Sequence, residues 1–380
     1  MRKLLILAIL YVFSIASFGA KSVKVKVINT SSLPRVNEII EVDWEVVKDK
    51  LGLGKNESIV VEDKNGKQLP YQVIYAGQKV PQSVIFPVSV EADGRNTYKI
   101  KKGLPETLQP LVHGRYVPER LDDFAWENDR IAFRMYGPAL KRQRPSNGVD
   151  VWLKRTDSLI VDKWYADFKE KGRNYHVDYG QGLDCYKVGQ TLGAGGIAPF
   201  FNDTLWIGKY YNTYEVLDNG PLRVTFSLSH TIPVAGKIVN EKITISLDAY
   251  SQLNKGVVSY EGGFNEMKVV AGIALHRKLG EIKTDQKAGY LAYAENAVSI
   301  KGENSGRSYT GLVFQLHMKD ITQDKTHLLG IASYKKGQYF TYYFGAGWSK
   351  WGFDTDESWF EYMADFTEKV RQPLNVTIKK

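Results

Sequence analysis

The chain has 380 residues, a formal net charge of +9 and one cysteine, Cys185. A single cysteine excludes an internal disulfide, and a chain of this length buries enough apolar surface to fold without one. The basic balance favours acidic partners, but no recognition-helix pattern or clustered run of Lys and Arg indicates a nucleic acid. We therefore expect a soluble protein of about two domains with an acidic glycan as its partner. The sequence does not indicate its oligomeric state.

The chain begins with MRKLLILAILYVFSIASFG, in which a basic start, an apolar run and a small-residue site follow one another. This order is typical of a secretory signal peptide, which we predict over residues 1–19. No later segment approaches the roughly 18 unbroken apolar residues that a membrane span needs. We expect a secreted or periplasmic protein without a membrane span.

Alternation of apolar and polar residues predicts strands over 23–28, 38–47 and 57–63. Asn65-Gly66 lies between two strand-like runs and predicts a hairpin, and QSVIFPVSVEADGRNTYKIKK supplies two more strands around an Asp-Gly turn. Residues 22–103 are thus predicted to form a small N-terminal β-sandwich-like module. Residues 104–125, rich in proline and with little periodicity, are predicted to be a linker.

The strands predicted after the linker are longer and more aromatic. In RIAFRMYG, Phe133 and Met135 share one face, while Arg134 and Tyr136 share the other. TYEVLDNGPLRVTFSLSH predicts a hairpin, and six further strand-like runs continue the meander. Residues 126–380 are therefore predicted to form one large antiparallel two-sheet sandwich, and the chain is all-β.

One C-terminal helix is predicted, in DTDESWFEYMADFTEKVRQP. Its apolar residues recur at three- and four-residue steps, Thr355 or Asp354 can cap its start, and Pro373 follows its end.

Three segments of the chain together resemble a known family: WENDRIAFRMYGPAL, YHVDYGQGLDCYKVGQTLGAGG and FGAGWSKWGFDTDESWFEYMADF. They are similar to an uncharacterised family of secreted bacterial proteins encoded in polysaccharide-utilisation gene clusters, often near unsaturated-glucuronyl hydrolases. The resemblance covers residues 24–378. The strand pattern also resembles the galactose-mutarotase-like supersandwich, which carries sugar epimerases, polysaccharide lyases and some glycosidases. The resemblance implies a carbohydrate substrate and leaves the reaction open.

The segment at residues 174–196 combines glycines with polar side chains. If it were a strand, His176 and Asp178 would point the same way, and the carboxylate would orient the imidazole as a base. A phosphate-binding loop is excluded because no strand and helix flank the glycines. No cofactor is expected. Asp178 and Asp184 could bind calcium, although their spacing matches no ordered calcium motif.

Further candidates come from strand faces. His276 ends VVAGIALH on a face of small residues that would leave room for a sugar ring, or it is an exposed strand-end histidine. His230 shares a face with apolar residues and is either a core histidine or a substrate ligand. Arg134 could clamp a uronate carboxylate, with Tyr136 beside it. Trp348, with Trp351, offers flat rings for sugar stacking, although aromatic residues also fill cores.

These candidates predict a secreted carbohydrate-active enzyme that acts on uronate-containing oligosaccharides by β-elimination or hydrolysis. His176 or His276 would be the base, Tyr179 or Tyr136 the acid, and Arg134 the carboxylate clamp. No metal site is predicted. A sugar mutarotase or epimerase is one alternative, and a glycan-binding protein without turnover is another.

Overall fold

A computed structural model describes residues 21–378 except 144, 277–279 and 317. The predicted signal peptide, residues 1–19, lies outside the described residues. Antiparallel strands make up most of the described chain, and the prediction of an all-β fold built on a large antiparallel sandwich is confirmed. Of the helices in the part of the chain that the structure describes, none is long and apolar enough to cross a membrane.

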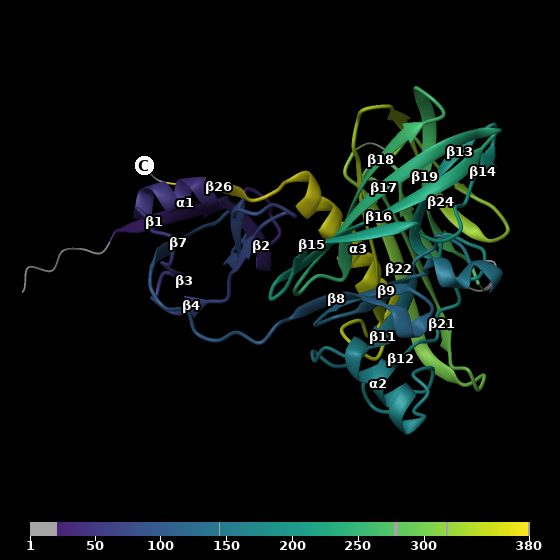
Figure 1. Ribbon diagram of the computed structural model, residues 1–380, viewed down its shortest axis with the longest axis horizontal. Coiled ribbons are helices and arrows are strands. Elements are labelled where there is room, and N and C mark those ends of the chain that lie inside the picture. Colours follow the sequence, from purple (N-terminus) through teal and green to yellow (C-terminus); the bar gives the residue numbers. More distant parts are fainter. Residues whose placement is uncertain (1–20, 144, 277–279, 317, 379–380) are drawn as a thin grey trace, which may run out of the picture.

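The N-terminal module is a small sandwich, separate from the larger one in Figure 1. One sheet has the order β26-β1-β7-β3-β4 and the other β2-β6-β5, and apolar residues of both form one core. Their bounds are β1 (Ser22–Ile28), β2 (Arg35–Asp43), β3 (Ile59–Glu62), β4 (Gln68–Leu69), β5 (Gln72–Ile74), β6 (Ser83–Val90), β7 (Arg95–Lys102) and β26 (Asn375–Ile378).

Two predictions for this module are corrected. The strand predicted over 38–47 ends at Asp43, whose carboxylate accepts a hydrogen bond from the Val46 amide and caps α1 (Trp44–Leu51). The module also extends beyond residues 22–103, because β26 at the far end of the chain pairs with β1. The Arg35 guanidinium donates to the Gln372 carbonyl at 2.7 Å and fixes the chain just before that strand.

The large domain has two layers. One is an eight-stranded sheet with the order β15-β16-β17-β18-β25-β22-β21-β20. Its strands are β15 (Thr213–Asn219), β16 (Arg223–Val234), β17 (Lys237–Asp248), β18 (Leu253–Gly262), β25 (Phe340–Trp348), β22 (Asn304–Phe314), β21 (Tyr290–Val298) and β20 (Glu281–Asp285). The hairpin predicted around Asn219-Gly220 joins β15 to β16.

Two five-stranded sheets form the other layer. The first contains β14 (Thr204–Leu205), β13 (Ala194–Phe201), β19 (Glu266–Ala274), β24 (His327–Lys335) and β23 (Asp320–Gln323). The second contains β12 (Gly182–Leu183), β11 (Asp150–Lys154), β10 (Ala132–Met135), β9 (Asp123–Asn128) and β8 (Val112–Val117). The predicted linker 104–125 is therefore shorter than expected, because β8 and the start of β9 pair within this second sheet and bury Val112 and Val117.

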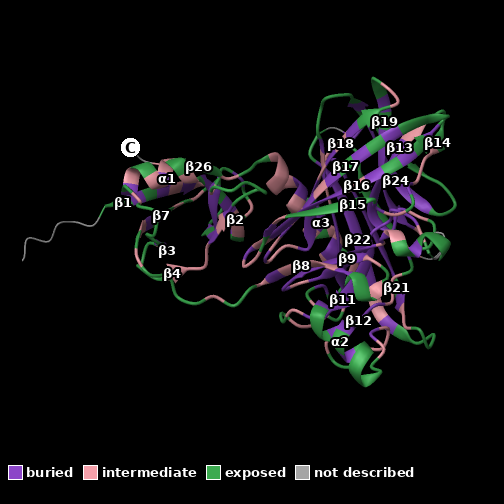
Figure 2. Cartoon of the chain, viewed as in Figure 1, coloured by how far each residue is buried: buried purple, intermediate pink, exposed green. Residues whose placement is uncertain are grey.

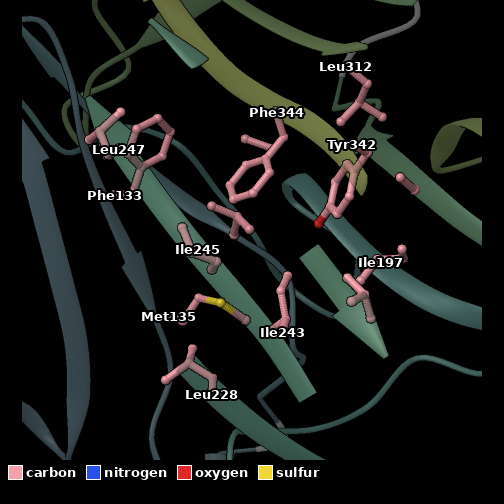
Figure 3. Packing of buried hydrophobic residues seen from close by; sticks show 14 of the residues in the cluster. Phe133, Met135, Ile197, Leu228, Ile243, Ile245, Leu247, Leu312, Tyr342 and Phe344 are labelled. Carbon is pink, nitrogen blue, oxygen red and sulfur yellow. The ribbon is translucent and has the colours of Figure 1, made fainter. Parts of the chain in front are cut away.

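The core lies between the layers. Figure 3 shows side chains of β10, β13, β16, β17, β22 and β25 pointing toward one another. Figure 2 shows that buried residues follow these strands, whereas much of α2 (Val161–Lys171) is exposed. The predicted C-terminal helix is α3 (Asp356–Arg371), capped by Thr355, and it covers the outer face of β21 and β22.

Candidate functional site

Strand alternation puts a row of charged residues on the outer face of β9, β10 and β11. Phe133 of β10 points into the core, so its neighbour Arg134 points outward. Asp150 lies opposite Arg134 on β11, and Asp123 occupies the same outer face of β9. Helix α2 and the segment that follows it lie over this face, so the row is buried.

Helix α2 is held in place by a second charged residue of β9. The carboxylate of Glu127 accepts hydrogen bonds from the backbone amides of Ile160 and Val161 at 2.7–2.8 Å, where α2 begins. The same carboxylate lies 2.8 Å from the ammonium of Lys154, and both side chains are fully buried. The helix start is therefore tied to the sheet beneath it.

Arg134 is surrounded by carboxylates of the protein itself. Its guanidinium lies 2.6 Å from Asp150, 3.1 Å from Asp184 and 3.8 Å from Asp123, and the side chain is 4% exposed. Burial raises the pKa of Asp123 to about 7 and raises the pKa values of Asp150 and Asp184 as well. The structure does not place Arg134 where a substrate carboxylate reaches it. Tyr136 is half-buried here, with its ring centre 5.5 Å from the same guanidinium.

The residues around His176 form turns, not a strand, so His176 and Asp178 do not act together. His176 Nδ1 lies 2.8 Å from the backbone carbonyl of Asp184, and burial lowers the pKa of its imidazole. Asp178 instead accepts hydrogen bonds from the Gly180 and Gly182 amides and pairs with Arg155 at 3.1 Å.

The same contacts separate the two aspartates considered for calcium. Asp178 is engaged by Arg155 and Asp184 by Arg134, so they do not share a site. Among the described residues, no group of three or more His, Cys, Asp or Glu side chains is arranged to hold a metal ion.

His276 lies in a different place, just after β19, and both of its ring nitrogens have partners. Nδ1 is 2.6 Å from Oε1 of Glu295 on β21, and Nε2 is 2.5 Å from the Lys187 carbonyl. The hydroxyl of Tyr293 donates to the other oxygen of Glu295 at 3.2 Å. The ring of Tyr186 meets the imidazole edge-on at a centroid distance of 4.8 Å.

This histidine–carboxylate pair forms part of the wall of an open depression. The depression encloses about 430 Å³, including open solvent, and Tyr186, Cys185, Asn296 and Ser308 also line it. The sugar-sized space predicted over the small residues of β19 is absent, because Leu192 and Leu329 pack against Gly272 there. Access to His276 is instead from the side of β21.

The contacts of His276 orient its ring. A carbonyl oxygen only accepts hydrogen bonds, so Nε2 donates to the Lys187 carbonyl. Nδ1 faces the Glu295 carboxyl group, which holds the other side of the ring.

Cys185 lines the same depression but is a poor nucleophile. Burial raises the pKa of its thiol to about 12, so little thiolate forms at neutral pH.

The remaining predicted residues lie apart from this depression. His230 is in the sandwich core, 3.1 Å from Glu241, with both side chains 1% exposed. Trp348 is 1% exposed, and its indole donates to the Ser305 carbonyl. Trp351 is half-buried beside it. Tyr179 is 56% exposed on the turn after α2.

Sequence reasoning missed Glu295 and Tyr186. A signal for Glu295 is present: it is the only charged residue in the strand YLAYAENAV, and it shares a face with Tyr293. A lone carboxylate in an apolar strand indicates a buried partner. Nothing near it in sequence identifies that partner as His276.

The fold and this site define a β-sandwich protein with a histidine–carboxylate pair in an open depression. The chain belongs to the family described as "Domain of unknown function (DUF4861)", whose model matches residues 27–376. A protein of Formosa agariphila, "Uncharacterized protein P7", is 29% identical over 381 residues, and the match covers 92% of each chain.

Two solved structures from Enterococcus faecalis are also similar to this chain. One is a protein in the glycosyl hydrolase family 38, with 10% identity and a TM-score of 0.48, and the match covers 96% of this chain and 48% of that one. The other is an alpha-mannosidase, with 8% identity and a TM-score of 0.45, and the match covers 95% and 46%. The chain spans about half the length of these structures.

Proposed function

We propose that this protein is a secreted or periplasmic enzyme that cleaves glycosidic bonds in uronate-containing oligosaccharides, with His276 as its general acid. The observation that carries the proposal is the hydrogen-bonded pair of His276 and Glu295, which lies in the wall of an open depression. The basic charge of the chain and the segments that resemble carbohydrate-utilisation proteins support the choice of an acidic glycan.

The proposed role of His276 is to protonate the leaving oxygen. In the structure, Nε2 is directed at the Lys187 carbonyl, and the proposal requires a glycosidic oxygen to replace that carbonyl when substrate binds. Glu295 holds the imidazole through Nδ1 and stabilises its charged form, while Tyr293 holds Glu295. His276 thus acts as an acid and not as the base that the sequence suggested.

Either cleavage reaction delivers a proton to the leaving oxygen. In hydrolysis, water adds its hydroxyl to the anomeric carbon and its remaining proton restores the acid; in β-elimination, the C5 proton is lost to a base as the C4–O bond breaks. Hydrolysis produces a new reducing end, whereas β-elimination also produces the ultraviolet absorbance of an unsaturated uronate. Incubation of the enzyme with tetragalacturonate and with its unsaturated counterpart distinguishes the two outcomes. If a broad panel of uronate oligosaccharides yields neither product, the proposed activity is wrong; binding without product would indicate a glycan-binding protein.

Substitution tests the role of His276. Loss of a general acid costs about 10²–10⁴-fold in rate, so His276→Asn should lower kcat by that factor. Glu295→Gln should lower it less, because the amide keeps a hydrogen bond to the ring but loses the charge. His113→Asn is a matched control, since His113 also pairs with a carboxylate, Asp162 at 3.3 Å, away from the depression. A wild-type rate in His276→Asn would refute the role.

A further inference from the structure

A second depression lies between α2 and the turn that follows it. It encloses about 370 Å³, including open solvent, and is lined by Lys163, Trp164, Arg173, Tyr175 and Tyr179 among others. The proposed reaction uses none of these residues. Their chemistry, aromatic rings beside cations, is that of a site for a ring-shaped anion.

Stacked aromatic rings lie behind this depression. Trp152 of β11 is stacked between Trp164 of α2 and Tyr175, with centroid distances of 5.4 and 5.2 Å and interplanar angles of 19° and 20°. All three rings are almost fully buried. At the rim, Tyr179 is 56% exposed and has the Arg173 guanidinium 5.6 Å from its ring centre. Tyr179 is therefore the ring that presents an exposed face to a ligand.

Cations exceed anions at this place. Three side chains surround the carboxylate of Asp167: Lys171 at 2.6 Å, Lys163 at 3.6 Å and Arg173 at 4.0 Å. The hydrogen bond from Lys171 is the largest cause of the lowered pKa of Asp167, so this carboxylate is ionised at neutral pH. Lys171 does not line the depression, so two cations there, Lys163 and Arg173, face the one carboxylate of Asp167. The cation side chains are half-exposed and stay available to a ligand.

The two depressions are joined by one short segment. Gly182 lines the depression at α2, and Lys187 lines the one at His276. Five residues of extended chain span at most about 18 Å, so the Cα atoms of these two residues lie within that distance. An oligosaccharide of a few sugar units covers such a span.

We propose that the depression at α2 binds an acidic sugar unit of an oligosaccharide, with the carboxylate of the sugar at Lys163 and Arg173 and its ring against Tyr179. This inference takes the choice of a saccharide from the proposed function. The preference for an acidic sugar unit is argued from the cations Lys163 and Arg173 and from the exposed ring of Tyr179. The site then holds one unit while a neighbouring bond is presented to His276.

Calorimetry on the full chain tests the site without turnover, in the His276→Asn background. The ligands are tetragalacturonate and, as the neutral comparison, maltotetraose. The double variant Lys163→Gln with Arg173→Gln should weaken tetragalacturonate binding about tenfold at low salt, because it loses two exposed ion contacts. At higher salt, the Kd values of the double variant and of the His276→Asn parent should lie closer together, because salt screens such contacts. Adding Tyr179→Ala to this double variant should weaken tetragalacturonate binding further.

Matched controls are Lys48→Gln with Lys102→Gln, two exposed lysines that also pair with carboxylates, and Tyr339→Ala, an exposed tyrosine elsewhere. Neither control should change the Kd. Equal binding of the two tetrasaccharides, an unchanged Kd in the Lys163 and Arg173 variant, or no binding of tetragalacturonate overturns the site. Binding and product formation are measured separately. If the proposed reaction is not found, the calorimetry still shows whether this depression binds the oligosaccharide.

Discussion

Replacing Asp123 with asparagine should make the stability of the large domain less dependent on pH. Burial raises the pKa of Asp123 from 3.8 to about 7, and its side chain is fully buried. Between these values the folded state binds more protons than the unfolded state, so stability is greatest below the unfolded pKa and falls as the pH rises through the folded one.

The magnitude follows from the two pKa values. Each pKa unit corresponds to about 1.4 kcal/mol, so ionising Asp123 costs the folded protein about 4 kcal/mol in total. About 3 kcal/mol of this cost is incurred between pH 5 and pH 8. Asparagine does not titrate, so Asp123→Asn should lack this part of the pH dependence and gain stability relative to the wild type at pH 8.

Urea unfolding followed by tryptophan fluorescence measures this effect, because seven of the eight tryptophans lie in the large domain and only Trp44 lies in the small one. The change in midpoint between pH 5 and pH 8 is compared at constant m-value. Asp203→Asn, on an exposed turn between β13 and β14, is the control and should behave as the wild type. If Asp123→Asn keeps the full pH dependence, or is less stable than the wild type at pH 8, the reasoning is refuted.

Three further outcomes are expected. Arg134→Met should cost about 3–5 kcal/mol at pH 8, because it leaves buried carboxylates unpaired, and less at pH 5, where they take up protons; an equal loss at both pH values in urea unfolding would contradict this. Glu127→Gln should speed amide hydrogen exchange in the first turn of α2, since the helix start and Lys154 lose their carboxylate; unchanged exchange there would show that packing alone holds the helix. Cys185 should react with a thiol reagent at pH 8 only in denaturant, because burial raises the pKa of its thiol to about 12; fast labelling of the native protein would disprove this.

The strands and their inner faces could be predicted because period-two alternation is local. Phe133 and Arg134 point to opposite sides, as the sequence of β10 indicates. What covers the outer face could not be predicted in the same way. The helical spacing of Val161, Trp164 and Tyr165 is visible in the sequence of α2, but nothing in it says that this helix packs over Arg134. A charged row on a strand therefore suggests a substrate-facing site when a helix in fact buries it.

The candidate site was predictable only in part for a related reason. His276 was identified from its position at a strand end, but its partners lie far along the chain: Glu295 is 19 residues away on β21, and the Lys187 carbonyl is 89 residues away. A backbone carbonyl has no signature in sequence. The proposed role of His276 as an acid rests on its contact with that carbonyl, so the role proposed for the residue depends on the tertiary fold.

The pairing of β26 with β1 also bears on the order in which the protein acquires its structure. Strand β1 has β7 on one side, and its other edge is filled only by the last strand of the chain. During synthesis the small module is made first, yet its sheet cannot be completed until the ribosome has finished the whole large domain. Until then β1 is an open edge that can pair with other chains. The first module to emerge is thus finished only after the large domain, because its closing strand, β26, follows that domain in the chain.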